Sequence, residues 1–307
     1  MRDAYINTLY QLTERDNSVF SFVADNGAIV FDRYRRSFPN NFVNFGIAES
    51  TMVSVSAGVS SCKKIPFIYT IIPFLVMRAF EQIRNDICMQ KMNVKIVGIG
   101  AGVSYSTLGP THHAIEDLAL MRVLPNMKIF SPADALETKK ATEAAYSIEG
   151  PVYIRLGTSK EPAVYNTDYD FQIGKGILLK DGKDVTLIAT GNSVHDAKLA
   201  SDILARDSIS VRLINIHTIK PFDNEIVIKA AEETKAIVTI EGHSVIGGLG
   251  SAVADTLAEY KNSVRFKKIG FNDCYCSEYG SFEEMKESCG ISVRNIVETV
   301  KQILEKK

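Results

Sequence analysis

Short, strongly apolar runs alternate with helical patterns along this 307-residue sequence, and the alternation limits the fold more than any other feature. Runs such as VTLIAT (185–190) and AIVTI (236–240) are rich in β-branched residues and show no regular change between apolar and polar positions. Strands of this kind are buried on both faces, which is typical of parallel sheets covered by helices on both sides. We therefore expect an α/β protein.

The expected elements divide into two groups along the chain. The expected strands are 18–24, 41–45, 65–69, 94–99, 127–130, 151–155, 184–190, 210–215, 235–240 and 264–270. The expected helices are 3–15, 47–60, 74–90, 113–124, 133–149, 192–206, 222–233, 246–260 and 292–305. The alternation lapses in a polar stretch that contains a proline, and we predict residues 161–170 to be a linker between domains at 1–160 and 171–307.

Composition excludes several classes of protein. The net charge of −1 gives no overall attraction to nucleic acid or to anionic lipid. The most apolar run, 65–77, contains two prolines and is too short to span a bilayer. The N-terminus carries charges throughout and lacks the apolar core of a signal peptide. We expect a cytoplasmic protein with no membrane or nucleic-acid partner.

The five cysteines predict neither a metal site nor a disulfide framework. They are odd in number and scattered over the sequence. Cys274 and Cys276 form a C-x-C pair, but no second pair of ligands lies nearby. Reduced thiols are the expected state in a cytoplasmic protein.

Two glycine-rich turns do not match nucleotide-binding fingerprints. In GIGAG (98–102) the following Val103 stands where the dinucleotide motif needs glycine, and in GGLGSAV (247–253) Val253 does the same. The sequence also lacks a P-loop and the G-x-S-x-G motif of serine hydrolases. We interpret both segments as tight turns.

Glu49 is a single carboxylate at the start of an apolar, small-residue helical pattern. Residues 49, 52 and 53 share a helix face, so the acid lies beside Met52 and Val53. One interpretation is a first-turn glutamate that is exposed and favoured by the helix dipole. The other is a carboxylate held in an apolar wall, where its proton affinity rises and it can share a proton with a ligand nitrogen.

Two further segments carry candidate groups. In LGPTHHAIED (108–117), a glycine–proline turn precedes His112 and His113 at an expected helix start near residue 113, where the neutral imidazole is favoured. No third ligand accompanies the two histidines, so we predict no metal site. Arg155 ends the apolar strand PVYIRL, where it would either clamp a phosphate or carboxylate or form a surface ion pair.

The motifs occur together and in an order that resembles the transketolase family. Those of the first half resemble the pyrimidine-binding domain and those of the second half the transketolase C-terminal domain, which implies two tandem doubly wound domains. The first-half motifs are NFGIAE (44–49), an aromatic-bearing segment that ends in RAFEQIRND (78–86), GPTHHAIEDLALMRVLPNM (109–127), SPAD (131–134) and GPVYIR (150–155). The second-half motifs are DGKDVTLIATGNSVHDAKLA (181–200), INIHTIKPFD (214–223) and IEGHSVIGGLGSAVADTLAE (240–259).

The resemblance implies a thiamine diphosphate site and gives roles to individual residues. Glu49 matches the acid that binds N1′ of the aminopyrimidine and promotes the imino tautomer, whose 4′ nitrogen deprotonates thiazolium C2. Phe74 matches the ring that stacks on the pyrimidine, and Asp25 matches an aspartate near the cofactor. His112 matches a histidine that faces the substrate oxygens, and Arg155 matches the arginine that receives the sugar phosphate.

Four positions depart from the family pattern. Leu108 replaces an aspartate that contacts a substrate hydroxyl, and Gly100 replaces a histidine, which we expect to open space near the substrate. Ile71 and Met77 stand at two further aromatic positions of the pyrimidine pocket. The donor and acceptor sugars are therefore left open, and a modified, deoxy or branched sugar is one alternative.

The resemblance also implies a partner subunit. Complete transketolases carry an earlier domain with a G-D-G motif that holds Mg²⁺ and the diphosphate, and no G-D-G occurs in this sequence. We therefore expect the C-terminal subunit of a split transketolase, a transferase active only with an N-terminal diphosphate-binding subunit, in a 2+2 assembly. Three alternatives remain: the β subunit of a 2-oxoacid dehydrogenase, a relative of 1-deoxyxylulose-5-phosphate synthase, and a non-catalytic scaffold subunit.

Overall fold

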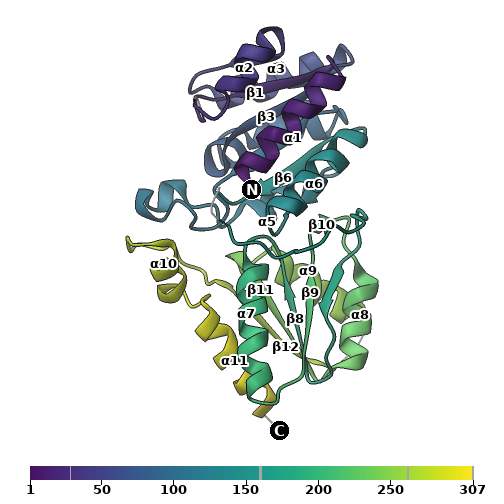
Figure 1. Cartoon of the computed structure of the whole chain (residues 1–307), viewed down its shortest axis with the longest axis vertical. Coiled ribbons are helices and arrows are strands. Elements are labelled where there is room, and N and C mark those ends of the chain that lie inside the picture. The colour runs from purple at the N-terminus through teal and green to yellow at the C-terminus, as the bar shows by residue number, and fades with distance from the viewer. Residues whose placement is uncertain (28, 159–160, 261–262, 306–307) are drawn as a thin grey trace.

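The computed structural model describes residues 1–27, 29–158, 161–260 and 263–305. Two sheets follow one another along the long axis of the molecule, with the N-terminal half at one end and the C-terminal half at the other (Figure 1). The strands within each sheet are mostly parallel, as the continuously apolar runs predict.

Within the described residues, the first sheet has seven strands in the order β10-β5-β6-β4-β3-β1-β2. All of its pairs are parallel except β10 with β5. The strands are β1 (Val19–Val23), β2 (Phe42–Asn44), β3 (Ile65–Ile71), β4 (Lys95–Ile99), β5 (Lys128–Phe130), β6 (Val152–Leu156) and β10 (Thr218–Lys220).

Both faces of this sheet are buried because successive side chains point to opposite sides. In β3, Phe67 and Tyr69 join the core shared with α1 (Arg2–Arg15) and α6 (Ala135–Ser147), whereas Ile68 joins the core on the opposite face. Around that opposite face the chain forms α3 (Glu49–Ser61), the π-helical turns η2 (Pro73–Met77) and η3 (Ile83–Cys88), α4 (Phe80–Gln82) and α5 (Asp117–Arg122). Short elements complete this half: α2 (Asp32–Ser37) and the 3₁₀ turns η1 (Pro39–Asn41), η4 (Ser106–Leu108) and η5 (Pro110–His112).

In the part of the chain that the structure describes, the second sheet has five strands in the order β12-β11-β8-β9-β7, and only the edge strand β7 is antiparallel. Its strands are β7 (Ile177–Lys180), β8 (Val185–Ala189), β9 (Val211–Asn215), β11 (Ala236–Ser244) and β12 (Arg265–Phe271). Helices α7 (Ser193–Arg206) and α11 (Val293–Glu305) pack together, as do α8 (Asn224–Glu233) and α9 (Leu249–Tyr260), on opposite sides of the sheet (Figure 1). A short helix, α10 (Phe282–Ser288), precedes α11.

All ten expected strands are present in the described residues. The sequence analysis did not predict the two edge strands β7 and β10. β7 and β10 are short, antiparallel and only partly apolar, so they lack the signal of a buried parallel strand. β10 also crosses the predicted division of the chain, because it lies in the second half and pairs with β5 of the first sheet. The domain bounds 1–160 and 171–307 and the linker 161–170 stay a prediction; residues 28, 159–160, 261–262 and 306–307 lie outside the described residues.

Three other expectations are corrected. The helix expected at 113–124 begins only at Asp117, because the backbone of Ala114 exchanges hydrogen bonds with Gly102 (2.8 and 2.9 Å) instead of forming a helical turn. The helix expected at 74–90 is interrupted at Ala79, where the backbone leaves helical values. Cys276 and Cys289 are joined by a disulfide, so the expectation of reduced thiols does not hold for this pair.

None of the helices in the described residues is both long and apolar enough to cross a membrane.

Candidate active site

Glu49 is a buried carboxylate. It is the first residue of α3, its exposed fraction is 2%, and Met52 and Val53 on the same helix face are fully buried. Its Oε2 atom accepts a hydrogen bond of 2.8 Å from Nη1 of Arg78. Of the two sequence interpretations, the structure therefore favours the carboxylate in an apolar wall over the exposed first-turn glutamate.

Phe74 and His112 lie together although 38 positions separate them in the sequence. Their ring centroids are 5.0 Å apart at an interplanar angle of 79°, an edge-to-face contact. Phe74 lies in η2, and His112 ends η5, where its Nδ1 atom is 3.0 Å from the hydroxyl of Thr111. The segment after β3 and the turn after β4 are therefore brought to one place.

Arg78 completes this cluster, and sequence reasoning missed it. Its guanidinium carbon lies 5.0 Å from the centroid of the Phe74 ring while the same group bonds Glu49. Arg78 follows Phe74 by four residues, the spacing that places two side chains on one face of a helix. This spacing was the available signal. We call Glu49, Phe74, Arg78 and His112 the acid–ring cluster.

Asp25 and Ile71, two of the remaining positions that the sequence predicts near the cofactor, lie at the carboxyl edge of the first sheet. β1 and β3 are parallel neighbours, with Val23 opposite Tyr69, so Asp25 and Ile71 follow at the same edge. The exposed Asp25 has a positive φ of 47°, and its N–H donates to Oδ1 of Asn44 at 3.0 Å. Ile71 is half-buried, as is Met77 at the end of η2. Ligands in doubly wound folds bind at this edge.

Leu108 and Gly100, the two departures that the sequence predicts at the substrate, have different surroundings. Leu108 is 50% exposed. It ends η4 and comes before the η5 turn that carries His112 in the sequence. Gly100, with a φ of +94°, lies against Tyr105, whose ring carbons Cε2 and Cδ2 would overlap a Cβ atom added at Gly100. The expectation that Gly100 opens space is therefore corrected, because the ring of Tyr105 fills that space.

Arg155 does not face a substrate site in this structure. Only 1% of it is exposed, and its guanidinium donates to both oxygens of Asp117 (2.8 and 3.1 Å) and to the carbonyl oxygens of Ala114 (2.8 Å) and Gly242 (2.9 Å). Gly242 lies in β11 of the second sheet. The expectation of a phosphate contact is therefore corrected, and Arg155 is a structural group that joins the two halves of the chain.

A second group of polar contacts joins the halves at Glu137. This fully buried carboxylate on α6 accepts hydrogen bonds from the backbone of Ala133 (2.6 Å), the side-chain amide of Asn215 on β9 (2.9 Å), Tyr165 (3.1 Å) and Tyr169 (2.5 Å). Burial raises the pKa of Glu137 to about 7, although these donors oppose the shift.

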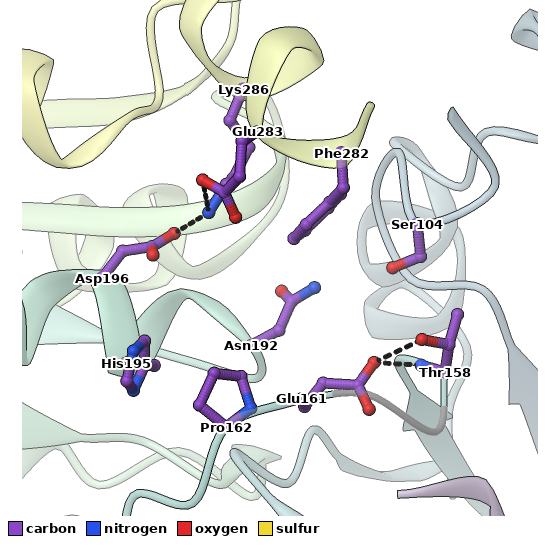
Figure 2. Close-up of a pocket in the computed structure, with 10 residues that line it drawn as sticks. All are labelled: Ser104, Thr158, Glu161, Pro162, Asn192, His195, Asp196, Phe282, Glu283 and Lys286. Atoms are coloured by element: carbon purple, nitrogen blue, oxygen red, sulfur yellow. Dashed lines mark hydrogen bonds and ion pairs between the residues drawn. The ribbon is translucent and has the colours of Figure 1, made fainter. Parts of the chain in front are cut away.

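A cavity of about 280 Å³ lies between the halves and shares no lining residue with the acid–ring cluster (Figure 2). Phe282 and Asn192 point toward its interior. On one wall Lys286 bonds Asp196 at 2.8 Å and Glu283 at 2.9 Å. On the other wall the hydroxyl of Thr158 donates to Glu161 at 3.0 Å. The charged groups of both walls are thus already paired within the protein.

The acid–ring cluster has the chemistry that an aminopyrimidine requires. Glu49 holds a planar N–H donor, the Arg78 guanidinium, which also lies over the face of Phe74. A protonated pyrimidine ring is likewise planar and offers an N–H to a carboxylate. Among the described residues no group of three or more His, Cys, Asp or Glu side chains could hold a metal ion.

Comparison with known families accounts for both halves of the molecule. The model of the transketolase pyrimidine-binding domain matches residues 1–162, and that of the transketolase C-terminal domain matches residues 174–296. The chain belongs to the transketolase family. The transketolase fold of two mostly parallel α/β sheets is thus confirmed.

Similar members of the transketolase family have nearly the same length as this chain. It is 35% identical to the 6-deoxy-6-sulfo-D-fructose transketolase subunit SqwH of Clostridium sp. (strain MSTE9), over 100% of this chain and 95% of the relative. It is 36% identical to an apulose-4-phosphate transketolase subunit of Phocaeicola vulgatus, over 99% and 97%. A solved structure described as a split gene transketolase, inactive beta4 tetramer, superimposes with a TM-score of 0.90 at 43% identity, covering 99% of this chain and 97% of that one.

Proposed function

We propose that this chain is the C-terminal subunit of a split, thiamine diphosphate-dependent transketolase, which transfers a two-carbon ketol unit between sugar substrates. The acid–ring cluster carries the proposal, because it places a buried carboxylate, an aromatic face and an imidazole together in a transketolase-family fold. The full-length matches to proteins named as transketolase subunits favour it over a dehydrogenase subunit or a synthase relative.

When bound, thiamine diphosphate supplies the carbon nucleophile of ketol transfer. Glu49 would hold the pyrimidine ring nitrogen and share a proton with it, and the apolar wall of Met52 and Val53 keeps that hydrogen bond out of water. Phe74 would stack on the ring. Ile71, Met77 and Asp25 would line the remainder of the pyrimidine site.

His112 would face the substrate oxygens. It is half-buried, its ring is fixed by the edge contact with Phe74, and its Nδ1 lies beside the hydroxyl of Thr111. An imidazole so placed can donate a hydrogen bond to a substrate carbonyl or hydroxyl and can exchange a proton with it.

A separately encoded N-terminal subunit would hold Mg²⁺ and the diphosphate. The near full-length matches to proteins named as transketolase subunits support this proposal. A 2+2 assembly in the cytoplasm would bring the two parts of each site together.

The substrate would differ from the ordinary pentose phosphates. Leu108, a half-exposed apolar side chain, stands in front of the His112 turn, and Tyr105 closes the space beside Gly100. The side chain of Leu108 cannot hydrogen-bond a sugar hydroxyl, and the ring of Tyr105 limits the room for a substrate group beside Gly100. The names of the two similar subunits give 6-deoxy-6-sulfo-D-fructose and apulose 4-phosphate as the sugars of those proteins.

Reconstitution tests the proposal. The purified chain is mixed with the diphosphate-binding subunit, Mg²⁺ and thiamine diphosphate, and ketol transfer is followed by mass spectrometry. We expect transfer only when both chains are present, and weak cofactor binding by this chain alone in calorimetry. Micromolar binding or turnover without the second subunit would contradict the split-enzyme proposal.

A further inference from the structure

Arg78 makes both contacts that the pyrimidine ring of the cofactor needs. Its Nη1 atom donates to Glu49 at 2.8 Å, and its guanidinium carbon is 5.0 Å from the centroid of Phe74. The acid that binds the ring nitrogen and the ring that stacks on the pyrimidine are thus both engaged by one side chain.

A guanidinium suits these two surfaces for the same reasons as a protonated aminopyrimidine. It is planar and cationic, presents N–H donors in the plane to a carboxylate and packs its flat face on aromatic rings. Since Glu49 is 2% exposed, water cannot readily supply the hydrogen bond that Arg78 provides. Arg78 therefore competes with the pyrimidine for Oε2 of Glu49 and for the face of Phe74 that it covers.

We propose that Arg78 occupies the place of the pyrimidine in the cofactor-free chain and is displaced when the cofactor binds. This inference rests on the proposed function. Arg78 provides the hydrogen bond of the buried Glu49 carboxylate until the cofactor binds. Because the Arg78–Glu49 bond must then be broken, the apparent affinity for the cofactor is lower, as for any binding site whose competent state is only partly populated.

The surroundings of Arg78 allow this movement. Its side chain is 49% exposed, so the guanidinium can turn toward solvent without crossing the core. Glu49 is its only ion-pair partner among the described residues. It follows η2 directly and precedes the interruption at Ala79, so it is not inside a regular helix.

Cofactor titration of the assembled enzyme tests the inference. In Arg78→Met, Glu49 lacks its donor until the cofactor binds, so we expect calorimetry to show thiamine diphosphate binding about tenfold tighter than in wild type, as for loss of one competing hydrogen bond to a charged group. The melting temperature of the cofactor-free variant should be lower than that of wild type, and its rise on cofactor addition should be larger. Arg78→Lys, which keeps the charge without the planar fork, should fall between the two.

Arg84→Met is the matched control. Arg84 is exposed in the adjacent η3 segment and donates to Asn85 instead of Glu49, so its replacement should leave cofactor affinity unchanged. Unchanged or weaker cofactor binding in Arg78→Met would overturn the inference, and so would an effect confined to the KM of the substrate. If the assembled wild type bound no thiamine diphosphate at all, the proposed function itself would fail.

Discussion

Replacement of Arg155 by methionine separates a structural role from a substrate-binding role. The variant leaves Asp117 fully buried with its charge unpaired by arginine, and it removes donors from the carbonyl oxygens of Ala114 and Gly242. Removing one partner of a buried ion pair costs about 3–5 kcal/mol. Because the whole free energy of unfolding of a domain is about 5–15 kcal/mol, we expect Arg155→Met to lose a large part of its stability.

Urea denaturation followed by circular dichroism measures this loss. Arg212→Met is the control, because Arg212 also lies within a strand but its partners Asp181 and Glu233 are on the surface, where such pairs contribute about 1 kcal/mol or less. Adding Asp117→Leu to Arg155→Met removes the unpaired charge and should restore part of the stability. The reasoning would be refuted if Arg155→Met unfolded like wild type while its affinity for sugar phosphates fell.

Three further variants test other parts of the molecule. Because burial raises the pKa of Glu137 to about 7, its stabilising effect is complete below the unfolded pKa near 4.5 and is lost as pH rises to about 7. Glu137→Gln should therefore remove up to about 1.4 kcal/mol per pH unit from the pH dependence of the free energy of unfolding, and an unchanged slope would contradict the assignment. Leu108→Asp in the assembled enzyme should shift kcat/KM toward a substrate with a hydroxyl at the contacted position by about tenfold, and an unchanged ratio against the deoxy analogue would show that Leu108 does not face the substrate. Lys286→Met should lower the free energy of unfolding by about 3–5 kcal/mol, because it leaves the mostly buried Asp196 unpaired, whereas Lys235→Met, at an exposed pair with Asp184, should cost about 1 kcal/mol or less.

The sequence predicted those parts of the fold in which local pattern and burial agree. Continuously apolar runs identified the parallel strands, including β4 and β8, because a strand with two buried faces has few polar positions. It missed β7 and β10, whose pairing depends on a distant strand and not on their own composition. The sequence pattern also predicted a helix that includes Ala114. This was wrong because the hydrogen bonds between Ala114 and Gly102 are not visible in a local pattern.

The sequence predicted candidate site residues where a family motif contains a side chain that suits a cofactor or a substrate. Glu49, Phe74 and His112 were named from three separate motifs, and the structure places Phe74 in contact with His112 and both Phe74 and Glu49 in contact with Arg78. The prediction for Arg155 was wrong because the sequence pattern of a strand-end arginine is the same whether it binds a ligand or a buried aspartate. Its partner Asp117 is 38 positions away, so a local pattern does not reveal the pair. The four-residue spacing could have linked Arg78 to Phe74, but the contact of Arg78 with Glu49 is visible only in the tertiary structure.

Hydrogen–deuterium exchange at C2 of thiamine diphosphate, in the enzyme assembled from this chain and its diphosphate-binding partner, tests the central claim most directly. Glu49→Gln keeps the shape of the side chain but cannot share a proton with the pyrimidine nitrogen as a carboxylate does. We predict that exchange slows by about 10²–10⁴-fold in this variant, the range for loss of acid–base catalysis. Exchange at the wild-type rate in a variant that still binds the cofactor would show that Glu49 is only a buried partner of Arg78, and would contradict the account.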